Sequence, residues 1–396
     1  MCGIAGFCNF KEDFEENTDY WNFRLEKMRA VLAHRGNDAR GRYLKKHIGL
    51  SHSRLAIRDI LCGDQPMTRT HNGYEYTICY NGEIYNTDEL IPELSENGFV
   101  CSTTSDTEVI LYAYIHWGAD FVNRLNGIFA FAIWDAAKSR LLLYRDRVGV
   151  KPLFYAIRGD SLVFGSEPKA CFAHPAVKPE LDKQGLQELL AIGPAHTSGL
   201  SLFKDLFEVL PGHFMIYSQD GLHDETYWEL TSREHTESYR DTVAHTRFLV
   251  EDAIKRQMVS DVPVCTFLSG GIDSSIVTAI AANYMNTRGK TLNTFSFDFK
   301  DNDRYFKANA FQPERDLPYV NRMLEEYETA HSYLECDENS LFKALFAAVD
   351  AKDMPGMTDV DSSLLYFCSL VSRKNKVALT GECADEIFGG YPWFYR

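Results

Sequence analysis

The sequence has no long hydrophobic run and no leader in which a basic segment precedes an apolar one. No stretch of 18 consecutive residues is apolar. A transmembrane helix needs about 20 mainly apolar residues, and a secretory signal needs a basic and then an apolar segment. We therefore expect a cytoplasmic protein without a membrane span or a membrane partner.

Cysteine pairs and an excess of positive charge are also missing. The ten cysteines are scattered without a Cys-x-x-Cys pair, so the sequence indicates neither a zinc site nor a disulfide framework. The 41 Lys and Arg residues stand against 56 Asp and Glu, which gives a formal charge of -15. Such a surface repels nucleic acid and anionic lipid. We expect small-molecule substrates and no nucleic-acid partner.

Length and pattern predict two domains. At 396 residues the chain exceeds the size at which one hydrophobic core stops growing. Short β-type segments dominate the first half, whereas strands and helices alternate in the second, which predicts a parallel sheet covered on both faces. The polar stretch 229–240 is the clearest shift in composition, so we place the domains at 1–215 and 232–396.

Hydrophobic periodicity predicts individual elements. Trp21, Leu25, Met28 and Leu32 form a stripe at helical spacing that ends near the breaker Gly36. In the first half we expect strands over 76–80, 128–134, 141–144, 153–157 and 162–164, helices over 88–97 and 106–117, and separating turns at Asn81-Gly82 and 158–160. In the second half we expect a helix around 249–258, strands over 262–268, 292–297, 331–334 and 377–380, and helices over 274–286, 318–327, 338–349 and 362–375.

Cys2 directly follows the initiator, in Met1-Cys2-Gly3-Ile4-Ala5-Gly6. Removal of Met1 would give one residue both a thiol and a free α-amino group. Because an α-amino group titrates near neutral pH, it can serve as the base for its own thiol. A cysteine at the second position can equally be a small, tolerated residue, so Cys2 alone does not decide the function.

A glycine turn lies between an apolar strand and a helix, in Leu268-Ser269-Gly270-Gly271-Ile272-Asp273-Ser274. Glycines let backbone N–H groups close on an anion, and the helix that follows adds its positive end. The spacing differs from that of a P-loop and of a dinucleotide fold. It resembles the S-G-G-x-D-S pyrophosphate loop of the ATP pyrophosphatase superfamily, which implies that Asp273 is a Mg²⁺ ligand. The alternative to a phosphate-binding loop is an ordinary polar turn in which a serine caps the helix.

A second polar cluster, Thr380-Gly381-Glu382-Cys383-Ala384-Asp385-Glu386, follows the predicted strand 376–379. Ligands of open parallel sheets bind at the carboxyl ends of strands, so both clusters can face one nucleotide. Closely spaced carboxylates repel one another when buried, and Mg²⁺ would relieve that repulsion. A solvated acidic turn is the alternative.

Taken together, these segments resemble the glutamine-dependent asparagine synthetases, in which a class II glutamine amidotransferase is fused to a synthetase domain. The resemblance covers essentially the whole chain. It implies an N-terminal-nucleophile hydrolase with an αββα sandwich, followed by a Rossmann-like parallel-sheet ATP pyrophosphatase domain. In the first domain it is carried by the segments 1–6, 34–36, 53–57, 81–86, 105–108, 145–147 and 151–153.

The resemblance implies a glutamine site in the first domain. Cys2 would attack the side-chain amide, while Asn81 Nδ2 and the Gly82 N–H would form the oxyanion hole. Arg54 would clamp the α-carboxylate, and Glu83 with Asp106 would meet the α-ammonium or position neighbours. Taken singly, Arg54 and Asp106 read as ordinary surface charges. The implied glutamine-binding set is Arg54, Leu55, Ala56, Ile57, Asn81, Gly82, Glu83 and Asp106.

In the second domain the resemblance implies ATP and Mg²⁺ as cofactors. Asp273 and Asp385 would hold the metal, and Glu382 would assist formation or capture of β-aspartyl-AMP. The implied reaction converts aspartate, ATP and glutamine into asparagine, AMP, pyrophosphate and glutamate, with ammonia passed internally, and a homodimer is the expected assembly. The implied ATP-binding set is Leu268, Ser269, Gly270, Gly271, Asp273, Ser274, Phe297, Thr380 and Gly381.

Two departures from the family pattern stand out. The family writes H-R-G-P-D where this chain has Asn37 in place of proline, a change that keeps a turn-forming residue. Family members also continue well beyond 388–391, into helices that supply a lysine for adenylation. We therefore expect a shortened synthetase that keeps glutaminase chemistry but has weak or no synthetase activity alone.

Two rival interpretations stay open. The motifs indicate glutamine and ATP but barely the acceptor, so another class II amidotransferase could adenylate a different carboxylate. The segment 359–363 could border an acceptor pocket, although a helix cap is the plainer account of Asp361 or Ser362. A non-catalytic remnant that assists a complete homologue is the other rival. The presence of Cys2, Asn81 and Asp273 favours catalysis over that interpretation.

Overall fold

The computed structural model describes residues 1–308 and 314–395, and the chain divides into two compact units. The first comprises Met1–Arg233 with Lys352–Gly356, and the second comprises Glu234–Ala351 with Met357–Arg396. Among the described residues, no helix has the length and apolar character needed to cross a membrane.

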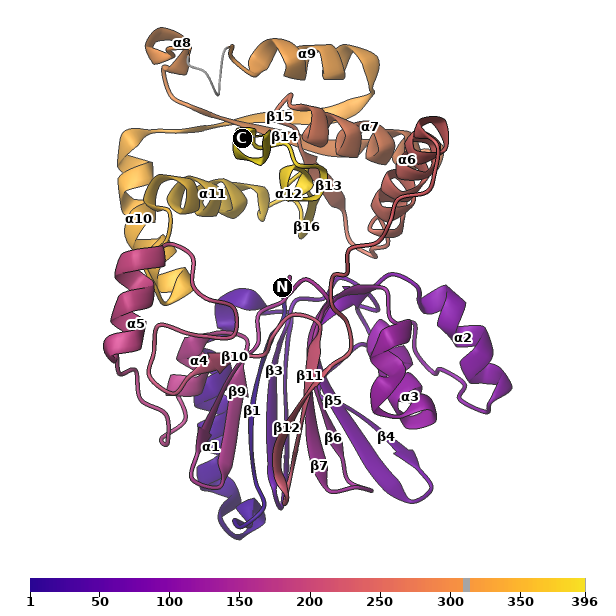
Figure 1. The fold of residues 1–396 in the computed structure, drawn as a ribbon, viewed down its shortest axis with the longest axis vertical. Helices are drawn as coiled ribbons and strands as arrows, with labels where there is room; N and C mark the ends of the chain where they lie inside the picture. Colours follow the sequence, from indigo (N-terminus) through magenta and orange to yellow (C-terminus); the bar gives the residue numbers. More distant parts are fainter. Residues whose placement is uncertain (309–313, 396) are drawn as a thin grey trace. The chain divides into compact units, whose positions relative to one another are not determined.

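The first unit contains two six-stranded antiparallel sheets (Figure 1). The first sheet has the order β10-β8-β9-β1-β3-β2, from β1 (Gly3–Asn9), β2 (Ala39–Lys45), β3 (Ile48–Arg54), β8 (Phe154–Arg158), β9 (Ser161–Gly165) and β10 (Phe207–Glu208). The second sheet has the order β12-β11-β7-β6-β5-β4, from β4 (Met67–His71), β5 (Tyr74–Ile84), β6 (Gly127–Asp135), β7 (Arg140–Arg145), β11 (His213–Ser218) and β12 (Gly221–Thr226).

Three hydrophobic layers hold these sheets and their helices together. Side chains alternate between the faces of a strand, so Ile4 and Cys8 of β1 join the core between the sheets, while Ala5 and Phe7 join the core beneath α1. A third core lies between the second sheet and α3. The arrangement confirms the expected αββα sandwich. Its helices are α1 (Thr18–Ala30), α2 (Thr87–Glu96), α3 (Asp106–Trp117), α4 (Pro168–Phe172) and α5 (Lys183–Gln187).

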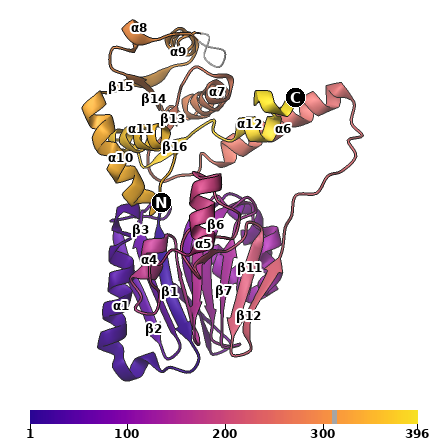
Figure 2. The same cartoon turned by 60° about the vertical axis from the view of Figure 1, so that its left-hand side comes forward.

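Helix α1 covers the outer face of the first sheet (Figure 2). It begins where the Asn17 side chain accepts a hydrogen bond from the N–H of Tyr20 at 3.4 Å, which satisfies one otherwise unpaired donor. Trp21, Leu25 and Met28 are buried, as their helical spacing predicts. This element confirms the expected outer helix.

The turn expected at Asn81-Gly82 is wrong, because β5 runs through both residues to Ile84. Asn81 pairs with Ala130 and Gly82 with Phe129 of β6. A Cβ on Gly82 would lie 2.3 Å from the carbonyl oxygen of Ile128. The glycine therefore serves a close approach of two strands rather than a reversal of the chain. The turn at 158–160 is confirmed, with Gly159 at a φ of +59°.

The second unit is built on a parallel sheet of order β15-β14-β13-β16 (Figure 1). Val264 of β13 packs against α7, whereas its neighbour Cys265 packs against Phe367 of α11, so both faces of the sheet are covered by helices. The alternation of strand and helix is confirmed. The strands are β13 (Val264–Phe267), β14 (Leu292–Phe299), β15 (Thr329–Cys336) and β16 (Val377–Leu379). The helices are α6 (Tyr239–Arg256), α7 (Ile272–Asn286), α8 (Asn302–Tyr305), α9 (Leu317–Glu326), α10 (Glu338–Lys352), α11 (Thr358–Val371) and α12 (Ala384–Phe388).

Candidate active sites

Cys2 lies immediately before β1 and is held by a backbone N–H group and an arginine side chain. The N–H of Leu55 donates to Cys2 Sγ at 3.3 Å, and the carbonyl of Cys2 accepts from Arg35 Nε at 2.9 Å. Burial raises the pKa of the Cys2 thiol above its ordinary value, and this effect outweighs the lowering by the Leu55 hydrogen bond. The thiol is therefore protonated at neutral pH and needs a base to become a nucleophile.

A small pocket surrounds Cys2 and brings most of the predicted glutamine-binding residues together. Its predicted members are Cys2, Arg54, Leu55, Ile57, Gly82, Glu83 and Asp106, and its further members are Arg58, Gly63, Gln65, Tyr80, Ser105 and Thr107. Ala56 is buried beside it, where its N–H donates to Asp38 Oδ2 at 2.8 Å. Residues up to 105 positions apart in the sequence therefore share one concave site.

Arg54 is buried at the end of β3, and its guanidinium is largely occupied by the protein itself. It donates to the carbonyl oxygens of Arg58, Asp59 and Ile60 and to Asp64 Oδ1, the last at 3.0 Å. In this arrangement Arg54 fixes the turn 58–64 and faces the pocket at the same time.

Asn81 carries a buried donor that has no hydrogen-bond partner among the described residues. Its Nδ2 atom is unpaired although the residue is only 1% exposed. Asn81 lies two residues after Cys79 on β5, so both side chains point to the same face of the strand, toward the core between the sheets. Cys2 lies two residues before Ile4, which joins that same core from β1. An unpaired buried amide is unfavourable, and Asn81 is not among the residues that line the pocket, although its neighbours Tyr80 and Gly82 are.

Asp106 and Glu83 form an acidic wall of the pocket. Asp106 is buried at the start of α3, where Oδ2 accepts from the Tyr80 hydroxyl at 2.8 Å and from the N–H of Ile84 at 3.0 Å. Burial, followed by the charge of Asp106, raises the pKa of Glu83 to about 8. Two neighbouring carboxyl groups form a site that favours a cation, such as the α-ammonium of an amino acid.

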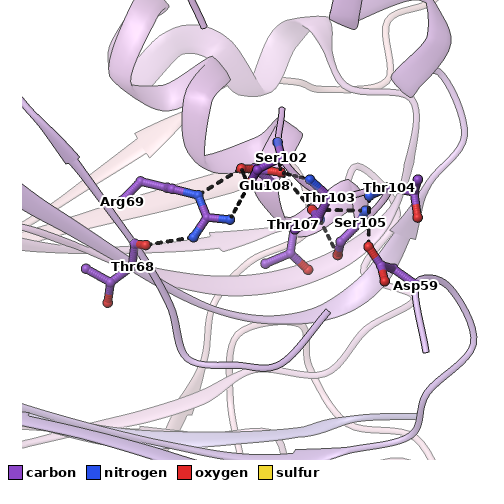
Figure 3. A network of polar contacts seen from close by, with 9 residues as sticks. All are labelled: Asp59, Thr68, Arg69, Ser102, Thr103, Thr104, Ser105, Thr107 and Glu108. Atoms are coloured by element: carbon purple, nitrogen blue, oxygen red, sulfur yellow. Dashed lines mark hydrogen bonds and ion pairs between the residues drawn. The ribbon is translucent and has the colours of Figure 1, made fainter. Parts of the chain in front are cut away.

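A polar network fixes the loop 102–105 that leads into Asp106 (Figure 3). Glu108 accepts from the backbone N–H groups of Ser102 at 2.9 Å and Thr103 at 2.7 Å, from both of their hydroxyls, and from Arg69 Nε at 2.8 Å. Burial alone would raise the pKa of Glu108, but the hydrogen bonds from Thr103, Arg69 and Ser102 lower it to about 2.

Glu108→Gln is expected to destabilise the first unit by about 2–4 kcal/mol, because charge-assisted hydrogen bonds to a fully buried carboxylate are lost. A carboxylate with a depressed folded pKa contributes stability above its unfolded pKa of about 4.3 and loses it as the pH falls toward the folded value. Urea unfolding should therefore show a full difference at pH 7 that shrinks below about pH 4.5. Glu93→Gln, in an exposed pair with Arg124, is the control. A difference that does not change with pH would contradict this role.

In the second unit, the glycine turn after β13 is tightly organised. Ser274 Oγ lies 2.9 Å from Ser269 Oγ and donates to the carbonyl of Gly271 at 3.1 Å. Gly270 has a φ of +86°, a conformation that glycine adopts without strain. The turn leads directly into the N-terminus of α7. This geometry fits a phosphate-binding loop.

The loop after β16 packs on this turn. A Cβ on Gly381 would lie 2.7 Å from the N–H nitrogen of Ser274 and 2.8 Å from Asp273 Cβ. Strands β13 and β16 are neighbours, so their carboxyl ends bring the two predicted clusters together. Thr380 and Gly381 thus lie beside the turn, whereas Glu382 is exposed.

A cavity of about 660 Å³ opens at the carboxyl ends of β13, β14 and β15. Of the predicted ATP-binding residues, Leu268, Ser269 and Phe297 line it, and Phe367 closes one wall. Its size lies in the range of small-molecule sites. Its position at strand ends is the usual one for nucleotides in open parallel sheets.

The two predicted metal ligands, Asp273 and Asp385, begin α7 and α12 beside these loops. No group of three or more His, Cys, Asp or Glu side chains suited to a metal occurs in the described part of the chain. Mg²⁺ commonly binds through one or two carboxylates together with substrate phosphates and water. Asp273, in the first turn of α7, fits that mode, whereas the carboxylate of Asp385 packs against Gly390.

Comparison with known proteins matches two family models to successive parts of the chain. A family model described as "Glutamine amidotransferase domain" matches residues 1–228, and one described as "Asparagine synthase" matches residues 245–396. The chain is 32% identical over 419 residues to "Putative asparagine synthetase [glutamine-hydrolyzing] 2" of Methanocaldococcus jannaschii, which covers 99% of this chain and 76% of that protein. The chain belongs to the glutamine-hydrolysing asparagine synthetase family. It is also 48% identical over 396 residues to "Asparagine synthetase [glutamine-hydrolyzing] 3" of Bacillus subtilis.

The chain spans 64% of the length of this Bacillus subtilis synthetase and 59% of the length of a second synthetase from the same organism. All 396 residues of the chain are covered by the first alignment. The asparagine synthetase resemblance predicted from motifs is therefore confirmed at the level of the family.

Several pocket residues of this synthetase-family chain escaped the sequence interpretation. Arg58 donates to the carbonyl of Ile84 at 2.9 Å and lies 4.0 Å from Asp106, and Gln65 Nε2 donates to Thr107 Oγ1 at 3.2 Å. Arg58 directly follows the recognised segment 53–57, whereas Gln65 adjoins no recognised segment and meets 105–108 only through the fold. With Asn37 in place of the family's proline, the neighbouring Asp38 still accepts a hydrogen bond from the N–H of Ala56.

Proposed function

We propose that this chain hydrolyses glutamine at Cys2 and uses the ammonia to convert an ATP-activated aspartate into asparagine. The observation that carries the proposal is the single pocket that joins the Cys2 thiol to Gly82, Glu83 and Asp106. The names of the relatives, glutamine-hydrolysing asparagine synthetases, supply the substrates. AMP and pyrophosphate would be the other products.

Glutamine hydrolysis follows from the groups in the pocket. With Met1 removed, the α-amine of Cys2 takes the proton of its own thiol, and the thiolate attacks the amide carbon of glutamine. Asn81 Nδ2 and the Gly82 N–H stabilise the oxygen that becomes negative. The amine returns the proton to the leaving nitrogen, so ammonia departs and a thioester remains. Water then attacks the thioester, which releases glutamate and restores the thiol.

The acidic wall selects glutamine by its head group. Glu83 and Asp106 would meet the α-ammonium, and a cation placed there lowers the pKa of Glu83. Arg54 would meet the α-carboxylate at the far end of the pocket. Substrates without both charged groups would lose these contacts.

The second unit supports ATP-dependent activation of a carboxylate. The phosphates would lie on the turn 269–271 and the N-terminus of α7, and the adjoining cavity offers room for the rest of the nucleotide. Asp273 and Asp385 would hold Mg²⁺, which neutralises phosphate charge when it is bound. Glu382 would assist formation or capture of the acyl adenylate. The chain would form a homodimer, which light scattering tests. It would act in the reducing cytoplasm, where the Cys2 thiol stays reduced.

Labelled aspartate tests the whole proposal. The purified chain is incubated with ATP, Mg²⁺ and glutamine, and asparagine, AMP and glutamate are measured together. Formation of all three supports both halves and would refute the expectation, drawn from the sequence, that this chain alone has weak or no synthetase activity. Glutamate without asparagine or AMP would limit the function to glutamine hydrolysis, and conversion of another carboxylate in place of aspartate would change the acceptor.

Gly381→Ala is expected to weaken ATP binding by about tenfold or more, because the added methyl displaces the loop after β16 from Ser274 and Asp273. Calorimetric titration with ATP and Mg²⁺ measures the change. Glutamine hydrolysis should stay within about twofold of wild type, because the substituted residue lies in the other unit. Thr287→Ala, at the exposed C-terminal end of α7, is the control. Unchanged ATP affinity in Gly381→Ala would argue against this loop as the phosphate site.

A further inference from the structure

Two loops form the walls of the Cys2 pocket, and one carboxylate ties them together. Asp59 Oδ1 accepts from the N–H of Cys62 at 2.8 Å, within the turn 58–64. Its Oδ2 accepts from the N–H of Thr104 at 2.8 Å, in the loop 102–105 (Figure 3). Asp59 is buried, so both bonds are protected from water.

Each loop supports one of the groups that would recognise the glutamine head group. The carbonyls of the turn 58–64 hold the guanidinium of Arg54, with Ile60 accepting at 3.1 Å and Arg58 at 3.3 Å. The loop 102–105 ends at Ser105, which caps α3 by accepting from the N–H of Thr107, and Asp106 follows at the first position of the helix. Asp59 thus connects the supports of Arg54 and Asp106.

We propose that Asp59 is a positioning residue that sets the spacing between Arg54 and Asp106 and thereby the affinity for the α-carboxylate and α-ammonium of glutamine. The inference rests on the proposed glutamine hydrolysis. Asp59 acts through these two residues, and the Cys2 thiol is held separately by Leu55.

The local chemistry of Asp59 suits this task. Both carboxylate oxygens accept from backbone N–H groups, which an amide side chain cannot reproduce, because its NH₂ would face one of those donors. Burial alone would raise the pKa of Asp59, but the hydrogen bonds from Cys62 and Thr104 hold it below its ordinary value. The φ of Asp59 is +46°, a region that Asp, Asn and Gly tolerate.

Asp59→Asn is therefore an isosteric test that keeps the backbone conformation. We expect the KM for glutamine to rise about 10- to 100-fold, in line with the loss of a hydrogen bond to a charged group, while kcat stays within about threefold. Alkylation of Cys2 by iodoacetamide, which lacks both charged head groups, should proceed at the wild-type rate. Asp59→Gly removes the carboxylate without backbone strain and should raise KM at least as much.

Asp182→Asn is the matched control, because its carboxylate also accepts from a backbone N–H, that of Gly185, at the start of α5. It should leave KM unchanged. An unaltered KM in both Asp59 variants would overturn the inference, and so would an equal loss in KM, kcat and alkylation rate, which would show general damage to the fold. A wild-type chain that releases no glutamate would instead refute the proposed function.

Discussion

Replacing Cys2 with alanine is expected to abolish glutamine hydrolysis, with a fall in kcat of at least about 10³-fold. The substitution removes the nucleophile while Leu55, Arg54 and Asp106 keep the walls of the pocket in place. Glutamate release from glutamine, followed with a coupled enzyme assay, measures the effect. Glutamine affinity, measured by calorimetry, should change by less than about tenfold.

Cys62→Ala is the matched control for Cys2→Ala. Its thiol is exposed, and only its backbone N–H takes part in the turn beside the pocket. This variant should hydrolyse glutamine at the wild-type rate. Retention of more than about a tenth of wild-type activity by Cys2→Ala would show that another group attacks the amide.

Asn81→Ala is expected to lower kcat for glutamine hydrolysis by about 10²- to 10³-fold and to change KM by only a few-fold. The physical reason is the buried Nδ2 atom, which has no hydrogen-bond partner in the described part of the chain. A donor without a ground-state partner gives its full stabilisation to an oxygen that becomes negative during the reaction. Steady-state kinetics with glutamine separates kcat from KM.

Asn81→Asp sharpens this test because it keeps the shape and replaces the donor with a negative charge. It should be slower than Asn81→Ala. Asn97→Ala removes an exposed amide whose Nδ2 donates to the carbonyl of Glu93, and it should have no effect. Equal rates for wild type and Asn81→Ala would exclude Asn81 from the oxyanion hole.

The sequence predicted best those elements that form an apolar stripe or a continuous apolar run. The bounds of β6 and β7, which are apolar runs, lie within one residue of the expected ranges, whereas α1, which carries the stripe, ends at Ala30, before the expected end near Gly36. In the second unit the alternation of strand and helix predicted all four parallel strands. Periodicity is visible wherever one face differs from the other.

Two of the missed strands, β1 and β3, show neither pattern, whereas β2 was missed although its burial alternates. All seven residues of β1 and of β3 are buried, so neither strand shows an alternation of apolar and polar residues. Strand β3 even buries Ser51 and His52, whose side chains bond to the carbonyls of Ala5 and Tyr80 at 3.2 and 3.0 Å. Polar residues in a sandwich core are satisfied by hydrogen-bond partners on other strands, and the sequence alone does not show these partners.

The candidate site shows the same division. Cys2, Asn81 and Asp106 occur in short segments that the resemblance to the synthetase family singles out. Asp59 and Glu108 act through backbone groups, and the Asp59 bond to Thr104 spans 45 residues. No local pattern reports such a bond, because folding creates the pairing.

Trapping the covalent intermediate on Cys2 tests the central claim most directly. The chain is quenched in acid during turnover with labelled glutamine, and the N-terminal peptide is analysed by mass spectrometry. The account predicts a free N-terminal Cys2 that carries a γ-glutamyl thioester, absent in Cys2→Ala. Glutamate release with no label on Cys2 would contradict it.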